Sequence, residues 1–243
     1  MIITLDDFIR EYQKIVDMGW IRTHRSGPTG IGKTLEDLLG IPENNIDGPD
    51  FGDYELKSCR INSNSMLTMF TRAPQPGRAN TYLRLKYGYS SGVYDNDEKV
   101  LHSTLSADRF TPIAGTGHKL KVTCKEDGVY IESEEGIEDI YWSREALKKC
   151  FEKKYKNKFV YAKAESRGVG ASEEFHFRDA YEVSGFNYDA FIRLLEAGKI
   201  YVDLRIGQYH QGPNAGKTHD HGTGFRIREY DQPFLFLINK RIV

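Results

Sequence analysis

The sequence predicts an α/β protein in which helices flank a mixed β-sheet. Segments whose apolar residues recur at helical spacing are interspersed with short apolar or alternating runs that are typical of strands. With 243 residues, the chain can form one large domain or a domain with a sizeable lobe. No apolar run approaches the length of a membrane span, so we expect no membrane partner.

Two amphipathic helices are expected near the N-terminus, because apolar side chains there recur every three or four residues. A threonine can cap the start of the first helix, and a glycine follows each helix as a stop. The helices are residues 5–18, after Thr4 and before Gly19, and residues 31–39, before Gly40. Glu36 lies beside the apolar stripe of the second helix, not within it.

Strands and two further helices follow along the rest of the chain. Two of the strands flank Glu-Asp-Gly, which is typical of a β-hairpin. The expected strands are residues 54–57, 66–71 (buried), 100–106, 120–124, 129–133, 159–164, 175–183 and 200–206; the helices follow Ser143 and Asn187. The last strand places Val202, Leu204 and Ile206 on one face. Residues 74–80 and 207–224 are expected to be loops, the second long enough to be functional.

Composition narrows the class of protein. Three widely spaced cysteines suit neither a disulfide framework nor a zinc site, and a reducing cytoplasm is the simplest setting. The N-terminus lacks a basic region followed by an apolar core, so no secretory signal is expected. A net charge of −1 argues against a general nucleic-acid coat protein. It is compatible with a nuclease, whose carboxylates offset a basic binding face such as residues 199–228.

The most informative stretch for chemistry is residues 47–57, Asp-Gly-Pro-Asp-Phe-Gly-Asp-Tyr-Glu-Leu-Lys. In a strand, Glu55 and Lys57 point to the same face, and a turn at 49–52 would bring Asp50 back towards them. Two carboxylates and one ammonium can hold a hard divalent cation and orient a water molecule, as phosphodiester hydrolysis requires. The same pattern is typical of a solvated strand edge, so the triplet alone leaves both interpretations open.

A second motif, Gly-Pro-Thr-Gly-Ile-Gly-Lys-Thr at 27–34, matches the phosphate-binding loop of nucleotide-binding proteins at every specified position. That interpretation places Lys33 at the phosphates and Thr34 on magnesium. Such a loop follows a buried parallel strand, whereas residues 21–26 are polar and charged. A glycine-rich start of a helix is one alternative. We favour a third use, contact with a phosphate of the DNA backbone.

Several stretches, in a fixed order along the chain, carry a family resemblance. They are residues 30–39, 49–50 with 55–57, 67–71, 202–207 and 216–227, and the last (Gly-Lys-Thr-His-Asp-His-Gly-Thr-Gly-Phe-Arg-Ile) is the most specific. Together they resemble the MvaI/BcnI type II restriction endonucleases, a MutH-like branch of the PD-(D/E)xK nucleases, and stand nearer the MvaI type. The match is poor from about residue 87 to residue 143 and at the C-terminal end.

The resemblance implies a restriction-endonuclease-like, MutH-like fold. A catalytic lobe would comprise mainly residues 1–75 plus central strands, and a DNA-recognition lobe mainly residues 76–118 and 199–228. Double-stranded DNA is the implied substrate, cleaved by a cytoplasmic prokaryotic enzyme that acts as a monomer without an obligate protein partner. A cognate DNA methyltransferase is expected in the same system. The alternatives are a MutH-like strand-nicking repair endonuclease, a nucleotide-binding protein using Gly27–Thr34, and an inactive DNA-binding module.

The resemblance also implies the roles of the catalytic residues. Asp50 and Glu55 would bind the metal, with Leu56 counted among the metal-binding positions, and Mg²⁺ is the implied cofactor. Lys57 would position or polarise the nucleophilic water, and Glu36 would support the site from its helix. All three members of the triplet are present, which disfavours an inactive DNA-binding module.

DNA recognition is expected from both ends of the chain. Arginine suits bidentate contact with guanine, and aspartate can accept a hydrogen bond from cytosine. The expected DNA-binding residues are Arg22, Arg25, Lys33, Thr34, Thr71, Arg72, Asp203, Arg205, His219, Asp220, His221 and Arg226. The His-Asp-His run also allows a polar loop or a shared metal, although no further ligand pattern supports the metal.

The MvaI type implies the recognition sequence CCWGG and the BcnI type CCSGG, where W is A or T and S is G or C. Thr71-Arg72 and the run at 218–222 favour CCWGG. In the minor groove, A·T and T·A present the same acceptors, whereas G·C adds an obstructing amine. We therefore expect a side chain near Thr71-Arg72 to probe that groove.

Overall fold

The computed structural model of the protein describes residues 4–42, 49–61, 66–92, 99–155 and 158–243, so Asp47 and Gly48 of the 47–57 stretch lie outside the described residues. The chain divides into two compact units, each assembled from separate segments. Unit 1 comprises residues 1–64, 155–186 and 236–243, and unit 2 comprises residues 65–154 and 187–235. The first boundary falls earlier in the chain than residue 75, the expected end of the first catalytic segment.

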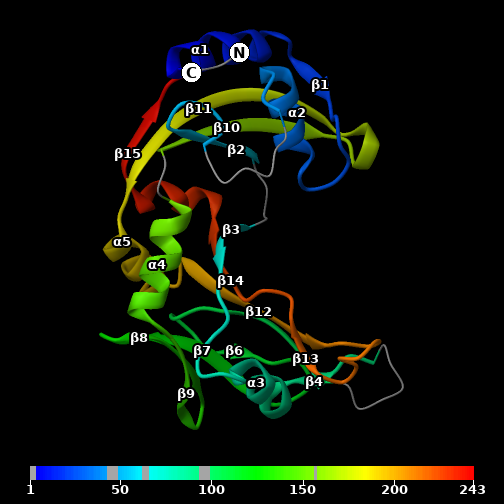
Figure 1. The fold of residues 1–243 in the computed structure, drawn as a ribbon, viewed down its shortest axis with the longest axis vertical. Coiled ribbons are helices and arrows are strands. Elements are labelled where there is room, and N and C mark those ends of the chain that lie inside the picture. Colours follow the sequence, from blue (N-terminus) through cyan, green and yellow to red (C-terminus); the bar gives the residue numbers. More distant parts are fainter. Residues whose placement is uncertain (1–3, 43–48, 62–65, 93–98, 156–157) are drawn as a thin grey trace. The chain divides into compact units, whose positions relative to one another are not determined.

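A five-stranded mixed sheet forms the centre of unit 1 (Figure 1). Its strands lie in the order β1-β11-β10-β2, and β15 pairs with β11. They are β1 (Trp20–Arg22), β2 (Tyr54–Arg60), β10 (Lys158–Arg167), β11 (Glu174–Phe186) and β15 (Phe236–Arg241), with the 3-10 helix η1 (Gly170–Ser172) between β10 and β11. β2 runs parallel to β10, and the other described pairs are antiparallel. Because β2 ends this order, one of its edges faces away from the sheet.

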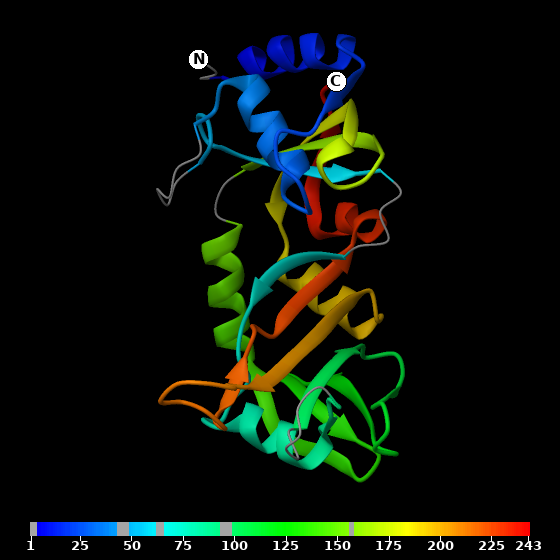
Figure 2. The same ribbon diagram turned by 90° about the vertical axis from the view of Figure 1, so that its right-hand side faces the viewer.

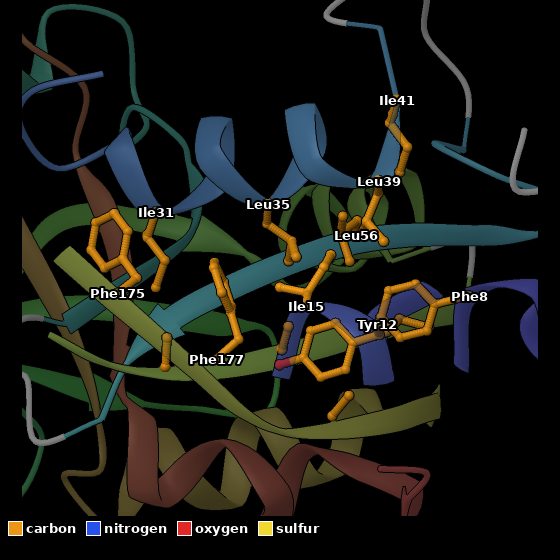
Figure 3. Close-up of a cluster of buried hydrophobic side chains, with 14 of the residues drawn as sticks. Phe8, Tyr12, Ile15, Ile31, Leu35, Leu39, Ile41, Leu56, Phe175 and Phe177 are labelled. Carbon is orange, nitrogen blue, oxygen red and sulfur yellow. The ribbon is translucent and has the colours of Figure 1, made fainter. Parts of the chain in front are cut away.

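Two helices, α1 (Leu5–Asp17) and α2 (Gly30–Leu39), cover one face of this sheet. Their buried side chains pack against those of β2, β10 and β11, and Figure 3 shows α2 lying along β2 with its apolar side chains towards the strand. The predicted threonine cap of α1 and glycine stop of α2 are both confirmed. Leu56 belongs to this core, so its neighbours Glu55 and Lys57 lie on the opposite face of the strand.

Unit 2 holds two antiparallel sheets. The six-stranded sheet has the order β3-β14-β12-β5-β4 with β13 beside β12, and the four-stranded sheet has the order β6-β7-β8-β9. Figure 2 shows β3, β14 and β12 as neighbouring cyan and orange arrows. The strands are β3 (Met66–Thr71), β4 (Tyr89–Ser90), β5 (Lys99–Leu105), β6 (Thr111–Pro112), β7 (Lys119–Cys124), β8 (Gly128–Ser133), β9 (Gly136–Ser143), β12 (Ile200–Gln208), β13 (Thr218–Asp220) and β14 (Gly224–Arg228). The helices are α3 (Ala79–Tyr87), α4 (Arg144–Lys154), α5 (Tyr188–Glu196) and the 3-10 helix η2 (Glu229–Leu235).

Several elements agree with the prediction from sequence, and the α/β fold class is confirmed. β7 and β8 form the expected hairpin. The Ser143 hydroxyl accepts a hydrogen bond from the first turn of α4, and Asn187 caps α5. Val202, Leu204 and Ile206 of β12 are fully buried. No helix among the described residues is long and apolar enough to cross a membrane.

Other elements differ from the prediction. The start of α3 and the whole of β13 lie where loops were expected, and β9, β14 and β15 were not predicted. α3 begins after Arg78, whose backbone has a positive φ of 72° and whose side chain makes no cap, so the usual start signal is missing. β13 and β14 are short and bordered by glycines, which hides their strand pattern. Of β3, only Met69 and Phe70 are buried, so the expectation of a fully buried strand was wrong.

Candidate active site and DNA-recognition face

The turn before β2 brings Asp50 against the strand. Phe51 and Tyr54 exchange backbone hydrogen bonds of 3.2 and 2.8 Å across the turn, and Gly52 adopts a φ of 49°. As a result, Asp50 Oδ2 accepts a hydrogen bond of 2.7 Å from the backbone amide of Leu56. The amide and carbonyl of one strand residue point to the same side, so the Leu56 carbonyl faces the same outer edge of β2.

Glu55 and Lys57 lie side by side on one face of β2. Lys57 Nζ donates to Glu55 Oε1 at 2.5 Å, and the two side chains are about one-third and one-quarter exposed. Tyr155, which was not predicted from the sequence, lies near Glu55. Burial raises the pKa of the Tyr155 phenol, and the Glu55 carboxylate raises it further. Tyr155 precedes β10 and lies far from Glu55 in sequence, so no local pattern links the two.

Glu36 lies on the helix side of β2. A Cβ atom on Gly32 would lie 3.6 Å from the Ser58 hydroxyl and 4.0 Å from the Glu36 carboxylate, so α2 passes close to the strand here. Among the described residues, no three His, Cys, Asp or Glu side chains are close enough to hold a metal ion together. Glu36, Asp50 and Glu55 therefore do not form a three-carboxylate cluster.

The donor atoms at the edge of β2 nevertheless suit a hard divalent cation. Within the described contacts, Asp50 uses one carboxylate oxygen for the Leu56 amide, and Glu55 uses one for Lys57. Each carboxylate retains a second oxygen, and the Leu56 carbonyl adds a third oxygen donor. Magnesium prefers oxygen ligands, keeps several waters and needs only one or two carboxylates, so these residues fit it.

The phosphate-loop motif has structural roles. The strand before it, β1, pairs antiparallel with β11, whereas a nucleotide-binding loop would follow a buried parallel strand. A Cβ on Gly30 would lie only 2.2 Å from the Arg25 carbonyl oxygen, so glycine is required there. The buried Thr34 hydroxyl donates to the Gly30 carbonyl and accepts from the His24 amide, at 2.8 and 2.9 Å. Lys33 Nζ donates to a carboxylate of its own helix at 2.7 Å.

The basic residues before α2 lie at the surface. Arg22 and Arg25 are both exposed, and Arg22 Nε donates to the Ala171 carbonyl at 3.1 Å. Arg60, at the end of β2, was not identified from the sequence. Its guanidinium donates to the backbone carbonyls of the 27–28 turn and pairs with Glu173 through contacts of 2.6 and 2.9 Å. Arg60 therefore joins β2 directly to the turn before α2.

In unit 2, one face of the six-stranded sheet gathers polar side chains around Asp203. Arg226 donates to Asp203 Oδ2 at 2.8 Å, the Thr104 hydroxyl donates to Oδ1 at 2.8 Å, and Arg205 Nε lies 3.7 Å from Oδ2. His102 is the cross-strand neighbour of Arg205 and is exposed. Thr104 and His102 were not identified from the sequence, because only the register of β5 against β12 places them here. The buried Asp203 thus lies between the two predicted guanine-reading arginines.

The first two residues of the His-Asp-His run belong to β13, and His221 directly follows the strand. His219 Nδ1 and His221 Nε2 are 3.3 Å apart, so both rings lie on one side of the strand. Asp220 lies on the other side, where its Oδ2 accepts from Asn80 Nδ2 at 2.8 Å. Burial lowers the pKa of His221, and electrostatic interaction with His219 and His102 lowers it further. No third ligand joins the histidine pair among the described residues, which leaves the metal alternative without support.

The end of β3 lies beside this region. Thr71 and Arg72 are exposed, and Thr71 is the cross-strand partner of Gly224. The Arg72 amide donates to the Thr223 carbonyl at 2.9 Å, and its carbonyl accepts from Trp142 Nε1 at 2.8 Å. Both backbone groups of Arg72 are therefore fixed while its side chain remains exposed.

A carboxylate-lysine strand edge and a sheet face rich in arginine and histidine are features of an enzyme that cleaves DNA. A family model described as the MvaI/BcnI restriction endonuclease family matches residues 9–236. Two solved structures are similar to the chain: a complex of the restriction endonuclease MvaI with its cognate DNA substrate, and MvaI in the absence of DNA. The first is 36% identical with a TM-score of 0.75, covering 98% of both chains. The second is 34% identical with a TM-score of 0.66, covering 98% of this chain and 97% of that one.

No curated protein matches the chain. The family match covers nearly the whole sequence, and the chain therefore belongs to the MvaI/BcnI restriction endonuclease family. It is a type II restriction endonuclease, an enzyme that hydrolyses DNA at specific sites. The resemblance inferred from the motifs and the restriction-endonuclease-like fold is thus confirmed.

Proposed function

We propose that this enzyme uses Mg²⁺ to hydrolyse both strands of double-stranded DNA at a CCWGG-like site. The observation that carries the proposal is the hydrogen bond from the Leu56 amide to Asp50, which brings a second carboxylate to the strand that bears Glu55 and Lys57. The likeness to a solved complex of MvaI with its cognate DNA substrate supports double-stranded DNA as the substrate.

In this proposal Asp50, Glu55 and the Leu56 carbonyl hold the metal. Bound Mg²⁺ supplies Lewis acidity, which activates a water molecule and offsets negative charge on the phosphate. The Lys57 ammonium, oriented by its contact with Glu55, points at the attacking water and stabilises charge that develops on the phosphoryl oxygens. Glu36 supports the strand from α2.

Sequence recognition is assigned to the polar face around Asp203. Arg205 and Arg226 have the side chain best suited to guanine O6 and N7, and their shared contact with Asp203 fixes their guanidinium groups before DNA binds. His219 and His221 extend this face, and Asp220 braces it. The exposed side chains of Thr71 and Arg72 would probe the minor groove at the central W pair.

Phosphate contacts are assigned to Arg22, Arg25 and Lys33, which lie around the start of α2. Thr34 is left out of this role, because its hydroxyl is buried and bonded within the protein. We further propose, on the family resemblance, a monomer in the cytoplasm of a prokaryote, accompanied by a cognate DNA methyltransferase that is not a physical partner.

The test is to incubate the protein with plasmid and Mg²⁺, without ATP, and to sequence the ends. Discrete double-strand ends at CCWGG are expected. Nicks confined to one strand would indicate a repair nickase, a requirement for ATP would indicate a nucleotide-binding function, and cutting at CCSGG with CCWGG intact would overturn the assignment of the site.

A pair of lysine variants tests the placement of the active site. Lys57→Ala is expected to abolish cleavage while specific DNA binding is retained in a gel-shift assay. Lys14→Ala, on the exposed side of α1, is the control and is expected to cut like the wild type. Cleavage by Lys57→Ala would show that the catalytic residues lie elsewhere.

A further inference from the structure

Helix α3 is fixed on one side by the carboxylate of Glu138. The Tyr82 hydroxyl and Lys86 Nζ donate to Glu138 at 3.1 and 2.9 Å, and the Tyr87 hydroxyl donates to the same carboxylate. Glu138 belongs to β9 of the four-stranded sheet, and its side chain is only 12% exposed. Leu83 of α3 is fully buried. The helix is therefore anchored by both apolar packing and a partly buried ionic contact.

The other side of α3 holds the ends of three strands through Arg84. This guanidinium donates to the Thr218 hydroxyl at 3.1 Å, to Gln208 Oε1 at 2.7 Å and to the Lys99 carbonyl at 3.2 Å. These acceptors belong to β13, β12 and β5 respectively. Arg84 is 6% exposed, and a buried charged group with several acceptors is costly to displace.

Asn80, one turn earlier in α3, fixes the rotation of β13 about its own axis. Its Nδ2 donates to Asp220 Oδ2 at 2.8 Å, and the Gly222 amide donates to Asp220 Oδ1 at 2.8 Å. Both oxygens of Asp220 are thus engaged within the protein. Successive side chains of a strand alternate, so holding Asp220 towards α3 directs His219 and His221 to the opposite side.

β13 depends on this support. It has only three residues, pairs with β12 alone among the described strands, and follows the 209–217 segment. A short edge strand next to a long connection gains little stability from its own backbone hydrogen bonds. Recognition groups discriminate between base pairs only when they are held in place before the DNA binds.

We propose that Asn80 and Arg84 are positioning residues for sequence recognition: through Asp220 and Thr218 they hold β13 so that His219 and His221 face the DNA. This inference rests on the proposed function, in which that face reads the bases. Asn80 and Arg84 themselves donate to acceptors within the protein. Specificity is therefore set partly by a helix outside the base-reading strands.

The experiment measures a discrimination ratio: kcat/KM at a CCWGG site divided by kcat/KM at a site with one altered base pair. A partly unfolded sample lowers both values equally, so a purely structural effect leaves the ratio unchanged. Asn80→Ala is expected to lower the ratio by about tenfold, the size of one lost hydrogen bond to a charged group. Arg84→Lys should also lower it, because lysine cannot reach three acceptors at once. Leu85→Ala, on the exposed side of α3, is the control and should keep the wild-type ratio.

A double-mutant cycle tests the route of the effect. If Asn80 acts through Asp220, Asn80→Ala should cause no further loss of discrimination in an Asp220→Ala background. The positioning role would be overturned by either of two results. In the first, Asn80→Ala lowers the discrimination ratio in the Asp220→Ala background as much as it does in the wild type; in the second, Asn80→Ala alone keeps the wild-type ratio. A wild-type enzyme that showed no sequence preference would overturn the proposed function and this inference with it, so the two failures are distinguishable.

Discussion

The carboxylate of Asp50 accepts a 2.7 Å hydrogen bond from the backbone amide of Leu56. One carboxylate oxygen therefore links the turn to the strand, and we propose that the other binds the metal at the strand edge. In the proposed mechanism the same side chain also binds the metal, and the two roles can be separated because only metal binding needs a negative charge.

Asp50→Asn is expected to keep the fold and lose the reaction. The asparagine oxygen can still accept from Leu56, but it cannot neutralise a metal, so the single-turnover cleavage rate should fall by at least about 10²-fold. Asp50→Ala should lose the same activity and also about 1–2 kcal/mol of the free energy of unfolding, measured in urea. Wild-type cleavage by Asp50→Asn would show that this carboxylate does not bind the metal.

Two glycine variants separate the structural from the nucleotide-binding interpretation of the 27–34 motif. Gly30→Ala should destabilise the protein strongly, because the new Cβ would lie 2.2 Å from the Arg25 carbonyl oxygen. Gly32→Ala should be neutral or stabilise by up to about 1 kcal/mol, since its Cβ meets only ordinary contacts in α2. Thermal unfolding and calorimetric titration with Mg-ATP provide the measurement. Binding of ATP that Gly32→Ala abolishes would contradict the structural interpretation.

The two arginines at Asp203 should differ in their effect on stability. Arg226→Ala leaves the largely buried Asp203 without its closest cation and should cost about 3 kcal/mol of the free energy of unfolding. Arg205 is 44% exposed and 3.7 Å from the same carboxylate, so Arg205→Ala should cost less than about 1 kcal/mol. Urea denaturation of both variants tests the difference. Equal losses would mean that Arg226 is not the principal partner of Asp203.

The lowered pKa of His221 predicts a pH dependence with a definite sign. The pKa is lowered by burial, then by electrostatic interaction with His219, His102 and Arg205, and Asp220 partly opposes this effect. The folded protein protonates His221 less readily than the unfolded chain does. Above pH 6.5, the ordinary pKa of histidine, His221 therefore does not reduce the free energy of unfolding; as the pH falls below 6.5, the free energy of unfolding decreases. His219→Ala should raise the pKa of His221 only partway, because burial remains. NMR titration of the ring measures this, and a pKa at or above 6.5 in the wild type would contradict it.

Local signals explain which parts of the molecule could be predicted from the sequence. The Thr4 cap and the Gly40 stop define helix ends without help from the rest of the chain. Strand alternation likewise places Glu55 and Lys57 on one face. In contrast, α3 starts at a residue with positive φ and has no cap residue, so it carries no such signal.

The polar face around Asp203 shows why the other contacts could not be predicted. Thr104 reaches Asp203 only because β5 pairs with β12. The register between two strands that are distant in the chain cannot be predicted from the sequence of either strand alone. Thr34 shows that a residue of a complete sequence motif can have a structural role. The Thr34 hydroxyl bonds to the backbone of His24 and Gly30.

The parallel pairing of β2 with β10 has a consequence for the protein during its synthesis on the ribosome. The whole 65–154 segment separates these strands in the chain, so a ribosome-bound protein exposes Glu55 and Lys57 long before their sheet neighbour has been made. Pairing between segments so far apart is slow, because a long loop must close first. During most of its synthesis the growing chain therefore lacks the completed sheet that holds Glu55 and Lys57. In the proposed function, the enzyme can cleave the DNA of the cell that makes it only late in synthesis.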